Sequence, residues 1–190
     1  MRFGLFYEHQ LPRPWSEGSE HKLLSDALDQ IEVADRLGYD YAWEVEHHFL
    51  EEYSHSSAPE LFLTACAMQT KQIRVGHGIV VCVPQINHPV RIAERAATLD
   101  IISGGRLEMG TGRSATWTEL GAFCANPDDT KKTWDEIVRC LPKMWTQERF
   151  SHMGDAVKVI NGPRDAELGD HGVMDWNTPW EVWMQPPPAT

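Results

Sequence analysis

The strongest constraint on the fold is a strand–loop–helix pattern that occurs four times along the chain. Short apolar segments predict strands at 2–7, 39–45, 73–83 and 106–111, and the third of them is rich in β-branched residues. Helical spacing of apolar residues follows each strand, at 23–37, at 59–70, at 89–103 and, after Asp128 and Asp129 as caps, up to residue 145. Alternating strands and helices form parallel sheets with right-handed crossovers. The sequence therefore predicts an α/β fold with four βα units in residues 1–145.

The pattern ends after residue 145. Residues 112–127 are expected to form a long loop, residues 150–160 a hairpin around Gly154, and residues 161–177 a turn-rich acidic stretch. A complete (β/α)₈ TIM barrel needs about 250 residues, so a chain of 190 residues has room for the first four of its eight units. We expect one domain over 1–190, a partial TIM barrel followed by an irregular excursion at 146–190.

Composition argues against two classes of partner. The chain has 17 Lys and Arg against 28 Asp and Glu, a net charge of -11, and so lacks the basic surface that nucleic acid or anionic lipid requires. It has no signal-peptide core and no apolar run near the roughly 20 residues that span a bilayer, so we expect a cytoplasmic protein. Three of its four widely spaced cysteines lie in apolar periodic segments and are expected to be core thiols: Cys66, Cys82 and Cys140.

Polar residues gather where each predicted strand ends. They are Glu8 and His9 after the first strand, Glu46, His47 and His48 after the second, residues 77–84 on the third, and Arg113 after the fourth. The carboxyl ends of parallel barrel strands form one rim, which carries the catalytic groups of such enzymes. Histidine exchanges protons near neutral pH, and a neighbouring carboxylate can fix its tautomer. We therefore expect an active site at this rim.

Two other interpretations of these residues stay open. Glu44, Glu46, His47 and His48 are all metal-ligand types, but adjacent residues of a strand point to opposite faces, which argues against a shared ion. His9 and His48 could equally be hydrogen-bonded structural imidazoles. The stretch 110–115 fits a loose dinucleotide fingerprint, yet no helix is predicted directly after it. Its glycines either let the backbone approach a phosphate or ring beside Arg113, or serve as simple turn residues.

The motifs together carry a resemblance to a known family. In order, they are Phe3-Gly4-x-Phe6, Trp43-x-x-Glu46-His47-His48-Phe49, Ile73-Arg74-Val75-Gly76, His88-Pro89-Val90-Arg91-x-Ala93-Glu94, Leu99-Asp100-x-x-Ser103-x-Gly105-Arg106 and Gly110-x-Gly112-Arg113. This series, from residue 2 to about 145, resembles the bacterial luciferase-like flavin monooxygenases. The resemblance implies a (β/α)₈ barrel that uses reduced FMN, supplied by a separate flavin reductase, and molecular oxygen on a small organic substrate. A homo- or heterodimer is also expected.

The same resemblance implies roles for particular residues. His47 matches the acid/base group beside the flavin, and Glu46 matches a glutamate close to the ring. Gly78 and Ile79 lie where the family often has a non-proline cis peptide under the ring. Arg113 matches an arginine near the flavin phosphate, and Lys131 stands roughly where another basic residue contacts it. Gly112 replaces a reactive cysteine of some relatives, so no thiol role is implied.

Two alternatives to an FMN monooxygenase follow from the same comparison. One is hydride transfer with a deazaflavin, which related barrels use. The other is a non-catalytic half-barrel, which either dimerises through its open strand edges or is a truncated remnant.

Overall fold

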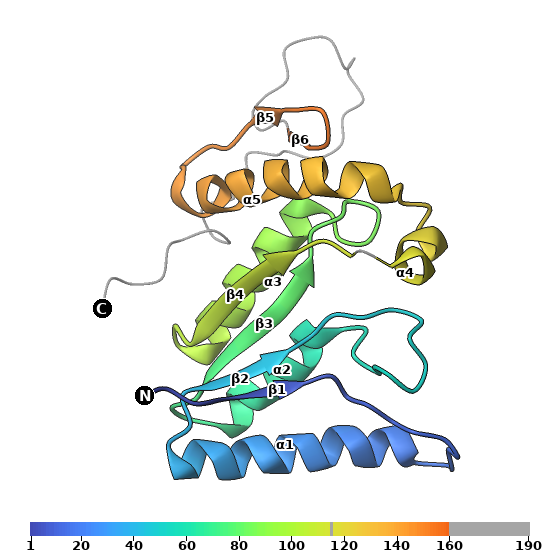
Figure 1. The fold of residues 1–190 in the computed structure, drawn as a ribbon. Helices are drawn as coiled ribbons and strands as arrows, with labels where there is room; N and C mark the ends of the chain where they lie inside the picture. The colour runs from blue at the N-terminus through green and yellow to red at the C-terminus, as the bar shows by residue number, and fades with distance from the viewer. Residues whose placement is uncertain (115, 160–190) are drawn as a thin grey trace, which may run out of the picture.

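Four parallel strands form the sheet of this protein. The computed structural model describes residues 1–114 and 116–159. The strands are β1 (Gly4–Tyr7), β2 (Tyr41–Glu44), β3 (Arg74–Val81) and β4 (Leu107–Gly112), in the order β1-β2-β3-β4 with every pairing parallel. The helices between and after them are α1 (Ser19–Leu37), α2 (Pro59–Gln69), α3 (Pro89–Ser103) and α5 (Thr130–Thr146). These are four consecutive βα units (Figure 1), as predicted.

Local sequence signals explain where the helices begin and end. Proline occupies the first turn of α2 and of α3, where its missing N–H costs nothing. Glycine ends α1 and α3 because Gly38 and Gly104 have φ values of 80° and 68°, in the left-handed region that suits a residue without Cβ. Helix α1 starts at Ser19 rather than at residue 23 because its first turn is polar and has no apolar period to detect.

The core lies between the sheet and the helices on one of its sides. One buried cluster joins α1 and α2 to β3 through Ile31, Leu63, Ile73 and Val75. A second cluster joins α3 and α5 through Ile92, Ile137, Leu141 and Met144. The thiols of Cys66, Cys82 and Cys140 are buried in these clusters, as predicted. Burial of this apolar surface is the main favourable term that holds the helices on the sheet.

On the other face of the sheet, aromatic side chains pack against glycine residues of β3. A Cβ on Gly76 would lie 2.5 Å from the ring of Trp43, and one on Gly78 would lie 2.9 Å from the ring of Phe6. The glycines of β3 therefore make room for two aromatic rings that lie against the strand. Phe6 remains 58% exposed. In a closed barrel this face would point to the interior.

The prediction of a long loop over 112–127 is wrong. This stretch contains the short helix α4 (Trp117–Ala122) and the 3₁₀ turn η1 (Pro127–Asp129). Helices of one or two turns are too short to show an apolar period. The hairpin is confirmed as β5 (His152–Met153) and β6 (Lys158–Val159), while residues 161–177 lie outside the described residues. Across the described part of the chain, every helix is too short or too polar to cross a membrane.

A buried carboxylate fixes the amino-terminal side of the sheet. Asp35, near the end of α1, accepts hydrogen bonds from the backbone N–H groups of Lys71, Gln72 and Ile73 at 3.0, 2.9 and 2.6 Å. Burial alone would raise the pKa of Asp35, but these three donors and nearby Arg106 hold the pKa below its ordinary value. The interaction ties α1 to the chain entering β3.

We predict that Asp35→Ala lowers the free energy of unfolding by about 3 kcal/mol at pH 7, because three backbone donors lose a charged acceptor. Since the folded-state pKa of Asp35 is depressed, its contribution is present above pH 3.8 and is lost as the pH falls through the lower folded value. Urea unfolding at pH 7 and at pH 3 measures both effects. Asp135→Ala on the exposed face of α5 is the control and should cause no measurable loss. An equally small loss for Asp35→Ala would contradict this account.

Candidate active site

The carboxyl ends of all four strands are joined by side-chain interactions. The imidazole of His47, after β2, reaches Glu8, after β1, with 3.5 Å between Nε2 and Oε2. The carboxylate of Glu46, also after β2, accepts a hydrogen bond from the N–H of Val81 at the end of β3. His47 also reaches Glu119 of α4, which follows β4. The convergence expected from the positions of these residues in the sequence is therefore present.

His47 lies between two carboxylates. Its Nδ1 is 3.0 Å from Oε1 of Glu119, and its Nε2 faces Glu8. Its backbone N–H donates to the carbonyl of Ser56 at 2.8 Å, and the edge of the ring contacts Tyr53. The side chain is 27% exposed, so one ring nitrogen can meet a bound molecule while the other is held by the protein. This is the arrangement of an oriented acid/base histidine.

Glu119 is the group that orients His47. It is 2% exposed, and its Oε2 accepts hydrogen bonds from the hydroxyls of Ser114 and Thr116 at 2.6 and 2.7 Å. Its Oε1 accepts from the backbone N–H of His48 at 3.0 Å. Burial alone would raise the pKa of Glu119, but these donors together with His47 hold the pKa below its ordinary value. Glu119 is thus an anion at neutral pH.

Sequence analysis missed Glu119, although a signal for it was present. Thr116-x-x-Glu119 has the spacing of a helix capping box, which marks the start of α4. In the structure Glu119 does not reach back to cap the helix; its carboxylate accepts from the Thr116 hydroxyl and lies against His47. The capping pattern could have found the helix but not the direction of its glutamate.

Glu46 is a buried support within the rim. Its two oxygens accept from the N–H of Val81 at 2.8 Å and from the side-chain amide of Asn87 at 2.6 Å, and His48 Nε2 lies 3.1 Å away. Only 5% of the side chain is exposed. Glu46 therefore holds the second strand end to the third, and Asn87 is a further residue that sequence analysis missed.

His48 and His9 have structural environments. His48 pairs with Glu46 and packs its ring against Phe123. His9 is buried beside Glu44, with 3.0 Å between Nε2 and Oε2 but poor alignment for a hydrogen bond, and the Ser56 hydroxyl donates to the same carboxylate. Burial raises the pKa of Glu44. Both histidines fit the structural alternative considered from the sequence.

Gly78 and Ile79 form a bulge in β3, with no cis peptide between them. Within the described residues the cis bond is Arg13–Pro14, so the expected non-proline cis peptide is absent. The pairing of β3 with β4 shifts between His77 and Val80, which leaves the two residues Gly78 and Ile79 opposite the single residue Gly110. A Cβ on Gly110 would lie 2.3 Å from the carbonyl oxygen of His77. This glycine therefore serves close strand packing, and it is not a turn residue.

The two predicted phosphate-binding residues meet the amino end of α5. Arg113 is exposed, and its Nη1 donates to the hydroxyl of Thr130, the first residue of α5, at 2.8 Å. Lys131 is the next residue of the same turn and is also exposed. A helix amino terminus offers free N–H groups and a positive dipole end, which favour an anion. No three His, Cys, Asp or Glu side chains among residues 1–114 and 116–159 are placed to share a metal ion.

Comparison with known proteins identifies the family. The family model described as luciferase-like monooxygenase matches residues 1–184. The chain belongs to the luciferase-like monooxygenase family. It is 29% identical over 157 residues to the oxygenase component of the flavin-dependent trigonelline monooxygenase of Acinetobacter baylyi, a match that covers 82% of this chain and 42% of the relative. Family members known to use flavin and oxygen are therefore among its relatives.

Solved structures show the same fold. The oxygenating constituent of 3,6-diketocamphane monooxygenase from Pseudomonas putida, in complex with FMN, has a TM-score of 0.76 at 24% identity, over 98% of this chain and 49% of that one. An F420-dependent secondary alcohol dehydrogenase has a TM-score of 0.68 at 20% identity, over 83% of this chain and 46% of that one. This luciferase-like chain thus folds as the first four βα units of a TIM barrel. It spans about half the length of these two structures.

We predict that Glu119→Gln lowers the free energy of unfolding by about 2 kcal/mol at pH 7, because the amide replaces a charged acceptor of four hydrogen bonds. The folded-state pKa of Glu119 is depressed, so its contribution is present above pH 4.5 and disappears as the pH falls through the folded value. Urea unfolding of parent and variant should therefore differ at pH 7 and converge in acid. A difference that is independent of pH would contradict the ionised state of Glu119.

Proposed function

We propose that this chain provides the proton-handling half of a flavin-dependent monooxygenase that uses reduced FMN and molecular oxygen on a small organic substrate. The observation that carries the proposal is His47, held by the Glu119 carboxylate at the strand-end rim of a luciferase-like fold. The relative from Acinetobacter baylyi is a flavin-dependent oxygenase component, which supports flavin as the cofactor and a separate reductase as its source.

The residues of the rim and of the open sheet face suit a flavin. Arg113, at the amino end of α5, supplies the charge that a phosphate needs, and we assign Lys131 to the same anion site. The aromatic face with Phe6 over Gly78 offers an apolar surface for a ring system. Glu46, Gly78 and Ile79 complete the proposed cofactor residues, with Glu46 acting through the strand ends that it holds together.

The proton chemistry of this site belongs to His47. Glu119 accepts a hydrogen bond from Nδ1, which leaves Nε2 as the nitrogen that takes or gives a proton at the rim. The carboxylate of Glu8 lies on the Nε2 side, 3.5 Å away. When bound, reduced flavin supplies the electrons that activate oxygen, and the protein has to exclude water and position a donor.

A second candidate cofactor is a deazaflavin, with hydride transfer as the reaction. It is favoured by the fold similarity to an F420-dependent alcohol dehydrogenase. The same imidazole would serve either reaction, since both need one oriented proton donor. Affinity for the two reduced cofactors separates them, and tighter deazaflavin binding would favour the second candidate.

We further infer that a second copy of the chain covers the outer face of α2 and α3. Helix α2 is mostly apolar, yet its Leu61 and Met68 are each 70% exposed. On α3, Ile101 is 61% exposed. The ion pair of Arg91 with Glu94 on this face offers both charges, so two copies related by a two-fold axis can exchange partners.

We predict that His47→Gln keeps the affinity for reduced FMN and changes the rate at which the bound flavin reacts with oxygen by about 100-fold, because a positioned acid/base group is lost. Anaerobic titration of the reduced flavin gives the affinity, and stopped-flow absorbance after mixing with oxygen gives the rate.

Arg113→Ala is the matched variant with the opposite expected result. It should weaken binding of reduced FMN about tenfold, and leave reduced riboflavin unaffected, because only FMN carries the phosphate. Absence of flavin binding by the parent chain, or equal loss of both flavins in Arg113→Ala, would contradict the proposed site.

The predicted dimer can be tested with Leu61→Glu. A charge at the centre of the α2–α3 face should convert a sedimenting dimer into a monomer, because burying an unpaired carboxylate is costly. Leu37→Glu, at a leucine of α1 that is 72% exposed, is the matched control and should leave the dimer intact. A parent chain that sediments as a monomer, or two variants that behave alike, would rule out this interface.

A further inference from the structure

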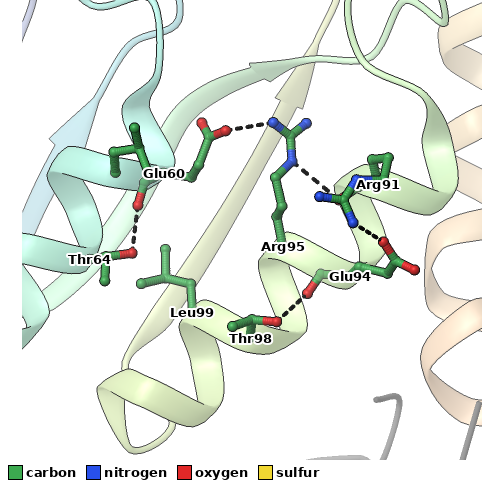
Figure 2. A pocket seen from close by; sticks show the side chains of 8 residues that line it. Glu60, Thr64, Arg91, Glu94, Arg95, Thr98 and Leu99 are labelled. Atoms are coloured by element: carbon green, nitrogen blue, oxygen red, sulfur yellow. Dashed lines mark hydrogen bonds and ion pairs between the residues drawn. The ribbon is translucent and has the colours of Figure 1, made fainter.

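A groove of about 450 Å³ lies between α2 and α3 on the outside of the fold. Figure 2 shows Glu60 of α2 and Arg95 of α3 facing each other across it, with Arg91 and Glu94 paired one turn away. The Arg95 side chain is 30% exposed and that of Glu60 is 24% exposed, so both can be reached from the surface. All residues that line the groove belong to α2 and α3, so it is separate from the rim that carries His47.

Arg95 nevertheless connects this groove to the rim. One arm of its guanidinium donates to Glu60 at 2.5 Å, and the other donates to the side-chain oxygen of Asn87 at 2.5 Å. The amide nitrogen of Asn87 in turn donates to Glu46 at 2.6 Å and to the carbonyl of Val81 at 3.0 Å. Two successive hydrogen bonds thus link a surface arginine to the buried carboxylate that joins the ends of β2 and β3.

The charge on Arg95 determines which way the amide of Asn87 faces. A guanidinium has donors only, so it requires the oxygen of the amide on its side and forces the NH₂ group toward Glu46. A flipped amide would place donor against donor at Arg95 and acceptor against acceptor at Glu46. His77 lies in the same buried layer; burial lowers its pKa, so it contributes no fixed charge that could replace Arg95.

We propose that Arg95 is a positioning residue for Glu46, and that it transmits the state of the α2–α3 groove to the rim through Asn87. The proposal deepens the proposed function, on which it rests for the use of the rim. A contact in the groove that draws Arg95 or Glu60 away changes the orientation of Asn87. Glu46 then loses a donor, and the second and third strand ends are less firmly joined. The second copy of the chain inferred above to cover α2 and α3 would in this way act on the site.

Amide hydrogen exchange tests the link without any cofactor. The N–H of Val81 donates to Glu46, whereas the N–H of Val75 in the same strand donates to the carbonyl of Arg106, far from this chain of bonds. We expect Arg95→Lys to speed exchange of the Val81 amide about tenfold relative to that of Val75, because a lysine cannot hold Glu60 and Asn87 with a planar fork. Glu60→Gln, which touches neither Asn87 nor Glu46, should shift the ratio in the same direction.

Arg91→Lys is the control, since it is the same substitution one turn away on α3, and it should leave the ratio of Val81 to Val75 exchange unchanged. Equal acceleration of both amides in Arg95→Lys would show general destabilisation and would overturn the proposal. An unchanged ratio in both Arg95→Lys and Glu60→Gln would overturn it as well. No flavin takes part in this experiment. If the chain failed to bind flavin, the proposed function would fail, but the exchange ratios would not change.

Discussion

The buried carboxylate of Glu119 is the interaction on which the candidate site depends. It collects donors from the chain between β4 and α4 and from the segment after β2, and so brings together residues that lie about seventy positions apart in the sequence. A buried carboxylate is costly unless donors surround it, and here each oxygen has two. The same donors that stabilise the anion therefore determine where His47 lies.

One end of the sheet contributes to stability, and the other end carries the candidate active site. At the amino-terminal side, Asp35 and Arg106 form hydrogen bonds to backbone groups and so hold the fold together. At the carboxyl side, His47 is partly exposed between carboxylates. All four non-glycine residues with positive φ among residues 1–114 and 116–159 lie in the loops on this side: His9, Phe49, Glu51 and Cys124. Strained backbone of this kind gathers at functional sites.

The sequence predicted what is periodic and missed what is local. The four βα units, the core thiols and the convergence of strand ends follow from apolar spacing and parallel topology, which act over many residues. Helix α4 is only six residues long, so it gave no period, and Glu119 was lost with it. Asn87 has no motif, because its role arises from Arg95 and Glu46 meeting in space. At Gly78 and Ile79 the structure has a bulge where a cis peptide was expected. The bulge depends on the pairing of β3 with β4, which the sequence does not show.

The most direct test of this account is the tautomer of His47 in the resting protein. With the Glu119 carboxylate 3.0 Å from Nδ1, the neutral ring should carry its proton on Nδ1 and leave Nε2, which faces Glu8, unprotonated. Long-range ¹H–¹⁵N correlation spectra of histidine-labelled protein distinguish the two nitrogens. A protonated Nδ1 and an unprotonated Nε2 would agree with the account, whereas a neutral ring protonated on Nε2 would contradict it.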